Sequence, residues 1–375
     1  MRRPRLTTLV SSLPATVPFV GPEAQERARG RPFRGRLGAN ESVFGPSPKA
    51  VAAMAAAAAE NWKYGDPESF ELETAIARFH GAGPENIVVG EGIDGLLGLT
   101  IKLAADPGTT VVTSDGAYPT FNFHVAGNGC RLVKVPFRND REDLDALLET
   151  AIREDARALY ISNPDNPMGS WWPADDIARL IERLPNGLLL ILDEAYSDTA
   201  PAGTLVPIDV GNPQVLRYRT FSKAYGLAGA RIGYCVGEAA LIQTFEKIRN
   251  HYGINRVGQI GALAALEDQE YLAAAVAQIA AAREEIARIG RANGLAPLPS
   301  AANFVTMDCG NDGAFARRVL AELIARDVFA RMPGVAPLDR CIRVSAGRPE
   351  DLAVFADVLP QALAAARKME PSGSL

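Results

Sequence analysis

The chain has 375 residues, of which 47% are hydrophobic and 22% are charged, and its formal net charge is −5. This balance is typical of a folded protein, and the length suggests about two domains that each bury a core. The charges form no long block, and no apolar run is long enough to span a bilayer, so we expect neither a nucleic-acid partner nor a membrane.

Cysteine and histidine are sparse. The four cysteines are scattered without a Cys-x-x-Cys spacing, and the chain has three histidines. We therefore expect no disulfide framework and no metal site. Reduced thiols favour a cytoplasmic protein. The basic start, residues 1–5, is followed by polar residues and Pro14, so it lacks the apolar segment of a signal peptide.

The first stretch of the chain, residues 1–40, is rich in proline, glycine and arginine. We predict an irregular arm there, with one short helix at residues 23–28, that also contributes to a small domain. Pro48 marks the first turn of a helix. The alanine-rich run at 51–59 continues that helix, because alanine has the highest helix propensity.

Short apolar strands then alternate with loops and helices. This pattern predicts an α/β fold with a mostly parallel central sheet and helices on both faces. Residues 188–192 are the clearest case, because five apolar residues without polar alternation are typical of a strand that is buried on both faces. The predicted strands are residues 87–89, 110–113, 131–135, 158–162, 187–192, 215–220 and 231–236.

The composition changes after about residue 240. Helical segments dominate, with short strands among them, which predicts a smaller α+β domain. The predicted helices are 241–248, 259–266, 271–293 and 352–367, and the predicted strands are 304–307 and 342–345. We therefore expect an arm with part of the small domain at 1–40, a large ligand-binding domain at 41–265 and a small domain at 266–370.

One lysine, Lys223, stands among small and apolar residues in the stretch 220–231. A buried ammonium is costly unless it is paired or neutral. A neutral amine in such a place can form a Schiff base with an aldehyde cofactor. The alternative is an ordinary loop lysine among glycines.

Several polar residues near this lysine and after an earlier strand suit an anion. They combine free backbone N–H groups at a helix start, hydroxyls and a guanidinium, which together favour phosphate. These candidates are Gly92, Ile93, Asp94, Thr220, Ser222 and Arg231. The alternative for the glycine segment is a plain turn between a strand and a helix.

Other candidates suit an aromatic ring. Asp193 ends the buried strand at 187–192, where a carboxylate needs a cation such as a protonated pyridine, an N-cap role or a salt bridge. Phe121 suits ring stacking or core packing. Asn166 and Tyr196 suit hydrogen bonds to a ring hydroxyl, although Asn166 also suits a turn. Whether Asn163–Pro164 or Asn166–Pro167 is cis stays open.

An arginine inside an apolar strand, Arg343, indicates an anion, which is either an acidic side chain or part of a substrate. Because ligands of open parallel sheets bind at the carboxyl ends of the strands, one ligand can touch most of these residues. Together they are the parts that pyridoxal 5′-phosphate needs to act on an amino-group substrate.

These motifs resemble the fold-type I, class I/II pyridoxal phosphate-dependent aminotransferases. Within that family they are most similar to the histidinol-phosphate aminotransferase subgroup. The resemblance runs from about residue 38 to 367 and is carried by segments 38–41, 163–169, 193–196, 222–231, 301–304 and 342–347.

The resemblance implies a role for each residue around the cofactor. Lys223 would bind it covalently and move a proton at the substrate Cα, and Asp193 would pair with the ring nitrogen. Asn166 and Tyr196 would contact the ring hydroxyl, and Phe121 would stack on the ring. The phosphate would be held by Gly92, Ile93, Asp94, Thr220, Ser222 and Arg231.

The resemblance also implies how substrate and partner bind. Tyr64 would reach the cofactor of the other subunit, which implies a homodimer. Arg343 would bind the substrate carboxylate or phosphate with help from Arg331, and Asn40 and Tyr252 would lie beside the substrate.

The activity implied is transfer of an amino group between an amino acid or amino-acid-like phosphate, of histidinol-phosphate or aromatic type, and a 2-oxo acid. The alternative on the same scaffold is a decarboxylase of a phosphorylated amino acid such as threonine phosphate. A cofactor-binding regulatory module is disfavoured, because the sequence has no DNA-reading segment and no basic face.

Overall fold

A seven-stranded sheet forms the large part of this computed structural model, which describes residues 4–15 and 19–368. The strands lie in the order β2-β8-β7-β6-β5-β3-β4. All neighbours run parallel except β8, which is antiparallel to both β2 and β7. The strands are β2 (Ile87–Gly90), β3 (Thr110–Ser114), β4 (Arg131–Val135), β5 (Ala158–Ser162), β6 (Leu189–Asp193), β7 (Val215–Thr220) and β8 (Gly233–Val236). The predicted mostly parallel α/β sheet is confirmed.

Two hydrophobic clusters cover the two faces of this sheet. Successive side chains of a strand point to opposite faces. Tyr160 and Ile191 accordingly belong to one cluster, and their chain neighbours Leu159, Leu190 and Leu192 belong to the other. The strands are apolar on both sides for this reason. The covering helices include α5 (Gly92–Ala104), α6 (Pro119–Gly127), α7 (Leu144–Arg153) and α8 (Ala174–Glu182).

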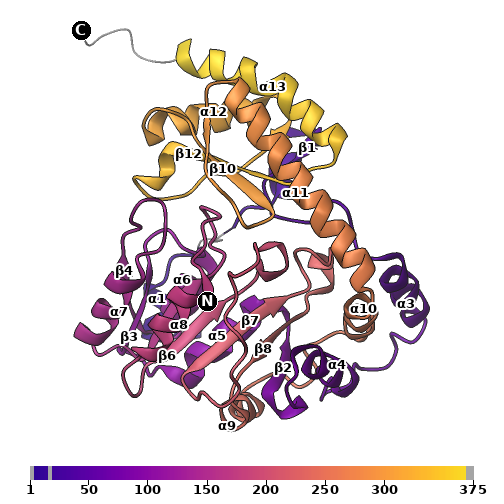
Figure 1. The fold of residues 1–375 in the computed structure, drawn as a ribbon, viewed down its shortest axis with the longest axis vertical. Helices are drawn as coiled ribbons and strands as arrows, with labels where there is room; N and C mark the ends of the chain where they lie inside the picture. Colours follow the sequence, from indigo (N-terminus) through magenta and orange to yellow (C-terminus); the bar gives the residue numbers. More distant parts are fainter. Residues whose placement is uncertain (1–3, 16–18, 369–375) are drawn as a thin grey trace.

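A smaller antiparallel sheet of three strands, in the order β12-β10-β9, lies above the large one in Figure 1. The long helix α11 runs from this part of the molecule toward α10 and α3 of the large part. The strands are β9 (Ala296–Pro297), β10 (Phe304–Asp308) and β12 (Cys341–Ser345), and the helices are α11 (Gln269–Ala292), α12 (Gly313–Ala325) and α13 (Pro349–Lys368).

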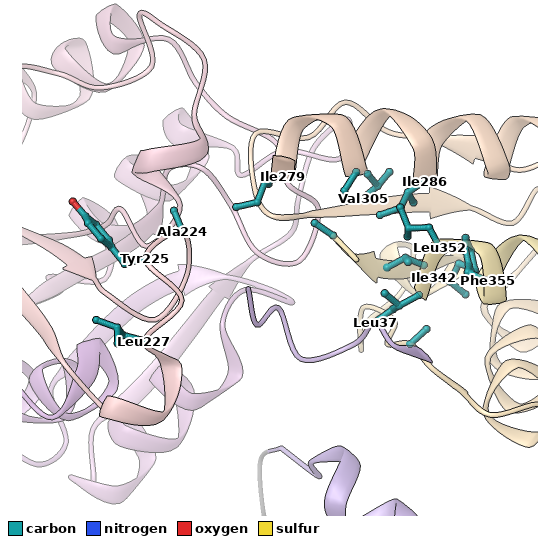
Figure 2. Close-up of a cluster of buried hydrophobic side chains, with 14 of the residues drawn as sticks. Leu37, Ala224, Tyr225, Leu227, Ile279, Ile286, Val305, Ile342, Leu352 and Phe355 are labelled. Atoms are coloured by element: carbon teal, nitrogen blue, oxygen red, sulfur yellow. The ribbon is translucent and has the colours of Figure 1, made fainter. Parts of the chain in front are cut away.

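The N-terminal arm joins this smaller part. β1 (Gly35–Arg36) pairs in parallel with β11 (Val328–Phe329). Leu37 is fully buried, and Figure 2 shows it beside Ile342, Leu352 and Phe355. The arm therefore supplies both a strand and a core side chain to the C-terminal part. The proposed domain boundaries after residues 40 and 265 stay predictions, and residues 369 and 370 lie outside the described residues.

The remaining helices surround the large sheet or belong to the arm. They are α1 (Thr8–Ser12), α2 (Pro22–Arg29), α3 (Pro48–Ala58), α4 (Phe70–His80), α9 (Ala239–Gln243) and α10 (Arg256–Leu266). None of the helices within residues 4–15 and 19–368 is long and apolar enough to cross a membrane.

Several local elements differ from the sequence-based expectation, including the short strands β1, β9 and β11, which were not predicted. The short helix α1 lies in the part of the arm that we expected to be irregular. The helix expected at 241–248 ends at Gln243 and continues as a 3₁₀ turn, Thr244–Lys247. Helix α12 was not predicted, although the Asp312 side chain caps it by accepting a hydrogen bond from the Phe315 N–H at 2.8 Å.

Candidate active site

A cavity of about 910 Å³ lies where the carboxyl ends of the parallel strands meet the smaller part of the molecule. Most of the residues singled out in the sequence line it. They are Asn40, Ile93, Asp94, Asn166, Asp193, Tyr196, Thr220, Ser222, Lys223, Arg231, Arg331 and Arg343. The large sheet, the arm and the smaller sheet thus bring together side chains that lie up to 303 positions apart, from Asn40 to Arg343.

Lys223 follows the end of β7 and points into this cavity. Its Nζ donates a hydrogen bond to the backbone carbonyl of Asn40 at 3.2 Å, and it lies 5.6 Å from the centre of the Tyr196 ring. Burial and then the charge of Arg343 lower the pKa of Lys223 to about 8, although Asp193 acts in the opposite direction. The neutral, nucleophilic form of this amine is therefore far more populated near neutral pH than it is for an ordinary lysine.

Asp193 lines the cavity at the end of β6. Its Oδ2 accepts a hydrogen bond from the Tyr160 hydroxyl at 2.7 Å, and its Oδ1 accepts one from the Ala195 N–H at 2.9 Å. The pKa of Asp193 lies above its usual value because the carboxyl is buried. The two hydrogen bonds and the charge of Lys223 oppose this effect without cancelling it. A cation placed above Asp193 would favour its charged form.

An anion site lies on the other side of Lys223, at the start of α5. The first N–H groups of a helix have no partner within the helix and carry partial positive charge. Arg231 packs so closely on Gly92 that a Cβ there would lie 2.5 Å from Arg231 Nη2. Gly92 also has a positive φ of 75°, which favours glycine, and a side chain there would displace the Arg231 guanidinium. Arg231 Nη1 donates to the Ala228 carbonyl at 3.1 Å, not to an acid.

Two further arginines line the cavity near the arm. The backbones of Arg331 and Arg343 exchange hydrogen bonds of 3.1 and 2.7 Å. Arg343 donates from Nη1 to Asn166 Oδ1 and from Nη2 to the Gly38 carbonyl at 3.4 Å, and its Nε has no partner. Burial lowers the pKa of Arg343 to about 10. An anionic ligand would offset the cost of burying this charge.

Asn40 joins the arm to Lys223. Its Nδ2 donates to the Tyr196 hydroxyl at 3.0 Å, and its carbonyl accepts from Lys223 and from Asn303 Nδ2 at 2.9 Å. The Ser345 hydroxyl donates to Asn40 Oδ1 at 2.9 Å. Asn303 and Ser345 were not singled out in the sequence as site residues, because only the folded chain brings them to Asn40.

Phe121 does not line the cavity. Its ring is fully buried and stacks on Tyr160 with centroids 4.2 Å apart. Tyr118, at the start of α6, faces the cavity instead. The predicted contact between Phe121 and a ligand ring is therefore wrong, because the helical turn after Pro119 directs residue 121 into the core.

Tyr64 and Tyr252 also lie outside the cavity. Their side chains are 77% and 57% exposed, and their rings pack together with centroids 4.8 Å apart. The prediction that Tyr252 contacts substrate does not hold within one chain.

The Asn163–Pro164 peptide bond is cis. The sequence alone did not decide between the cis and trans forms of this bond.

The comparisons with known proteins agree with this geometry. The family model described as "Aminotransferase class I and II" matches residues 36–359. The chain belongs to the class I and II aminotransferases. Within residues 4–15 and 19–368 of this aminotransferase, no group of three or more His, Cys, Asp and Glu side chains could hold a metal ion.

Named relatives of this aminotransferase cover nearly its whole length. The crystal structure of histidinol-phosphate aminotransferase from Sinorhizobium meliloti in complex with pyridoxal-5′-phosphate is 52% identical, with a TM-score of 0.94 over 97% of this chain and 98% of that one. Histidinol-phosphate aminotransferase of Roseiflexus castenholzii is 35% identical over 94% of this chain and 96% of its own. The Moorella thermoacetica enzyme of the same name is 30% identical over 96% and 94%.

The lowered pKa of Lys223 predicts a pH-dependent effect on stability in the ligand-free protein. Between its folded value of about 8 and its unfolded value of 10.5, the folded state binds fewer protons than the unfolded state, so stability rises with pH across that window. Lys223→Met removes the burial penalty and should stabilise the protein at neutral pH by up to about 3 kcal/mol.

This gain should shrink as the pH rises from about 8 to 10.5, measured by urea unfolding at each pH. Lys102→Met, which changes an exposed lysine on α5, serves as the matched control. A gain from Lys223→Met that is the same at every pH would contradict the assigned pKa.

Proposed function

We propose that this chain is a pyridoxal 5′-phosphate-dependent aminotransferase that transfers the amino group of histidinol phosphate, or of a related aromatic amino substrate, to a 2-oxo acid. The observation that carries the proposal is that Lys223, Asp193 and the Arg231 anion site all face one cavity. The relatives named histidinol-phosphate aminotransferase support the choice of substrate.

The residues present fit this cofactor. A buried amine without an acid partner, a guanidinium beside open helix N–H groups, and a buried carboxylate match an aldehyde, a phosphate and a ring nitrogen. When bound, the cofactor supplies an electron-accepting ring that makes the proton on the substrate Cα acidic.

The chain's own groups provide the remaining functions. Lys223 binds the cofactor and then takes and returns the proton at the substrate Cα, a role that suits an amine with a pKa of about 8. Asp193 would keep the ring nitrogen protonated. Tyr196 and Asn166 would contact the ring hydroxyl, and Tyr118 would pack on the ring in the place expected for Phe121. The phosphate would be held by Ile93, Asp94, Thr220, Ser222 and Arg231, with Gly92 leaving space for the Arg231 side chain.

Arg343 and Arg331 bind the anionic end of the substrate. Arg343 has an Nε without a partner, and Arg331 Nη1 donates only to the Val20 carbonyl at 3.1 Å within the described residues. Both guanidinium groups therefore retain N–H donors that can bind a carboxylate or a phosphate. Asn40 holds Lys223 and Tyr196 in place beside that end of the substrate.

The substrate assignment predicts the outcome of a donor panel. Histidinol phosphate should give the highest kcat/KM with a 2-oxo acid acceptor, and aromatic amino acids should follow. Lys223→Ala should lower kcat by about a thousandfold or more, because it removes both the attachment point and the proton carrier. Amino-group transfer is measured as formation of the amino acid from the 2-oxo acid. Release of carbon dioxide from a phosphorylated amino acid, without consumption of the 2-oxo acid, would instead establish the decarboxylase.

We further propose a cytoplasmic homodimer in which Tyr64 contacts the cofactor phosphate of the partner subunit. An exposed aromatic surface of Trp62, Tyr64, Phe70 and Tyr252 lies around the segment between α3 and α4 and around the turn before α10. Such a surface is typical of a protein interface. All four cysteines are free thiols, which suits a reducing compartment.

The dimer proposal predicts that Tyr64→Phe weakens cofactor binding by about tenfold, because it removes one hydrogen bond to a charged group. Cofactor affinity is measured by titration of the visible absorbance, and the mass is measured by analytical ultracentrifugation. Trp62→Phe, on the same surface, should leave the cofactor affinity unchanged. A monomer of 40.0 kDa, or an unchanged affinity in Tyr64→Phe, would refute the proposal.

A further inference from the structure

Two carboxyl groups near Asn166 are buried, and the proposed chemistry does not use them. Glu142 lies just before α7, and Asp165 lies in the loop after β5, next to Asn166. Each is 2% exposed. Neither forms an ion pair within the described residues, although buried acids normally need a cation or several hydrogen-bond donors.

Each carboxyl has one oxygen with a donor and one without. Glu142 Oε2 accepts from the Ser162 N–H at 3.0 Å, and Asp165 Oδ2 accepts from the Met168 N–H at 2.9 Å. The second oxygens, Glu142 Oε1 and Asp165 Oδ1, are buried and have no hydrogen-bond partner. A buried carboxylate oxygen without a donor is costly, and protonation of that oxygen relieves the cost.

Neighbouring charges change the pKa values of Glu142 and Asp165, and the charge of Asp165 is one of those that act on Glu142. Burial and then the Asp165 carboxylate hold the pKa of Glu142 well above its usual value, and the Asp193 charge acts in the same direction. Burial raises the pKa of Asp165 to about 7 against the opposing charge of Arg343. The Ser162 N–H and the Ser114 hydroxyl face Glu142, and the Met168 and Gly169 N–H groups and the Ser170 hydroxyl face Asp165. Two interacting buried acids of this kind titrate as a unit.

We propose that Glu142 and Asp165 carry one proton between them at neutral pH, and that this proton keeps Arg343 available to the anionic group of the substrate. Asp165 is the chain neighbour of Asn166, which accepts the hydrogen bond from Arg343 Nη1. Arg343 Nε is unpartnered. When the pair loses its proton, a second negative charge behind the loop attracts this guanidinium away from the cavity. Glu142 and Asp165 are therefore positioning residues.

The shared proton can be measured without catalysis, by infrared spectroscopy of the protein at neutral pH in H₂O and D₂O. A protonated carboxyl has a C=O stretch separate from that of a carboxylate. The difference spectrum between wild type and Glu142→Gln should contain one such band, because the neutral amide no longer repels the Asp165 carboxylate, which then becomes ionised. Asp165→Asn should lose the same band and serves if Glu142→Gln does not fold.

Two control variants isolate the band. Glu149→Gln, which makes the same change on the exposed side of α7, should leave the spectrum unchanged. Glu73→Gln should remove a different protonated carboxyl, because burial raises the pKa of Glu73 to about 8. No protonated carboxyl in the difference between wild type and Glu142→Gln would overturn the shared proton.

The effect on Arg343 rests on the proposed function and is tested separately. As the pH rises above neutral and the pair loses its proton, the KM of wild type for histidinol phosphate should rise relative to that of Glu142→Gln by about tenfold, while the ratio of their kcat values stays flat. Titration of Lys223 and of the substrate affects both enzymes and cancels in the ratio. A KM ratio that does not change with pH would overturn the control of Arg343, whereas absence of any transamination by wild type would refute the proposed function and leave the infrared result standing.

Discussion

The buried amine of Lys223 is the constraint on which the rest of the site depends. Removing a lysine from water favours its neutral form, and the charge of Arg343 adds to this effect while Asp193 opposes it. The balance leaves a pKa of about 8, so the amine is nucleophilic and can also carry a proton. Arg343, Asp193 and Arg231 all line the same cavity, and each of these charges affects the pKa of Lys223.

The sheet explains how so many distant residues meet. Parallel strands end at one edge, and the polar residues that follow β5, β6 and β7 therefore gather there. The arm completes the cavity, because β1 pairs with β11 and Asn40 follows a short segment, residues 37–39, after β1. Asn40 then bonds with Lys223 and Tyr196, while Asn303 and Ser345 of the smaller part hold it in place.

Residue chemistry and position after a strand were enough to predict much of this site. Lys223 and Asp193 are each costly to bury, so their place just after apolar strands indicates a ligand from the sequence alone. The same reasoning predicted the mostly parallel sheet from the apolar run in β6, which needs cover on both faces.

The features that sequence could not provide depend on packing. Phe121 and Tyr118 are both aromatic and near one strand end, and only the phase of α6 decides which of them faces the cavity. Glu142 lies among charged residues that look solvent-exposed, and only the folded chain buries it beside Asp165. A pattern in one segment carries no information about such tertiary neighbours.

Attachment of the cofactor to Lys223 can be measured by borohydride reduction of the cofactor-loaded protein, followed by peptide mass mapping. We expect a cofactor-derived mass on the peptide that contains Lys223 and on no other lysine. A cofactor mass on a different lysine, or none after reduction of protein that has taken up cofactor, would contradict it.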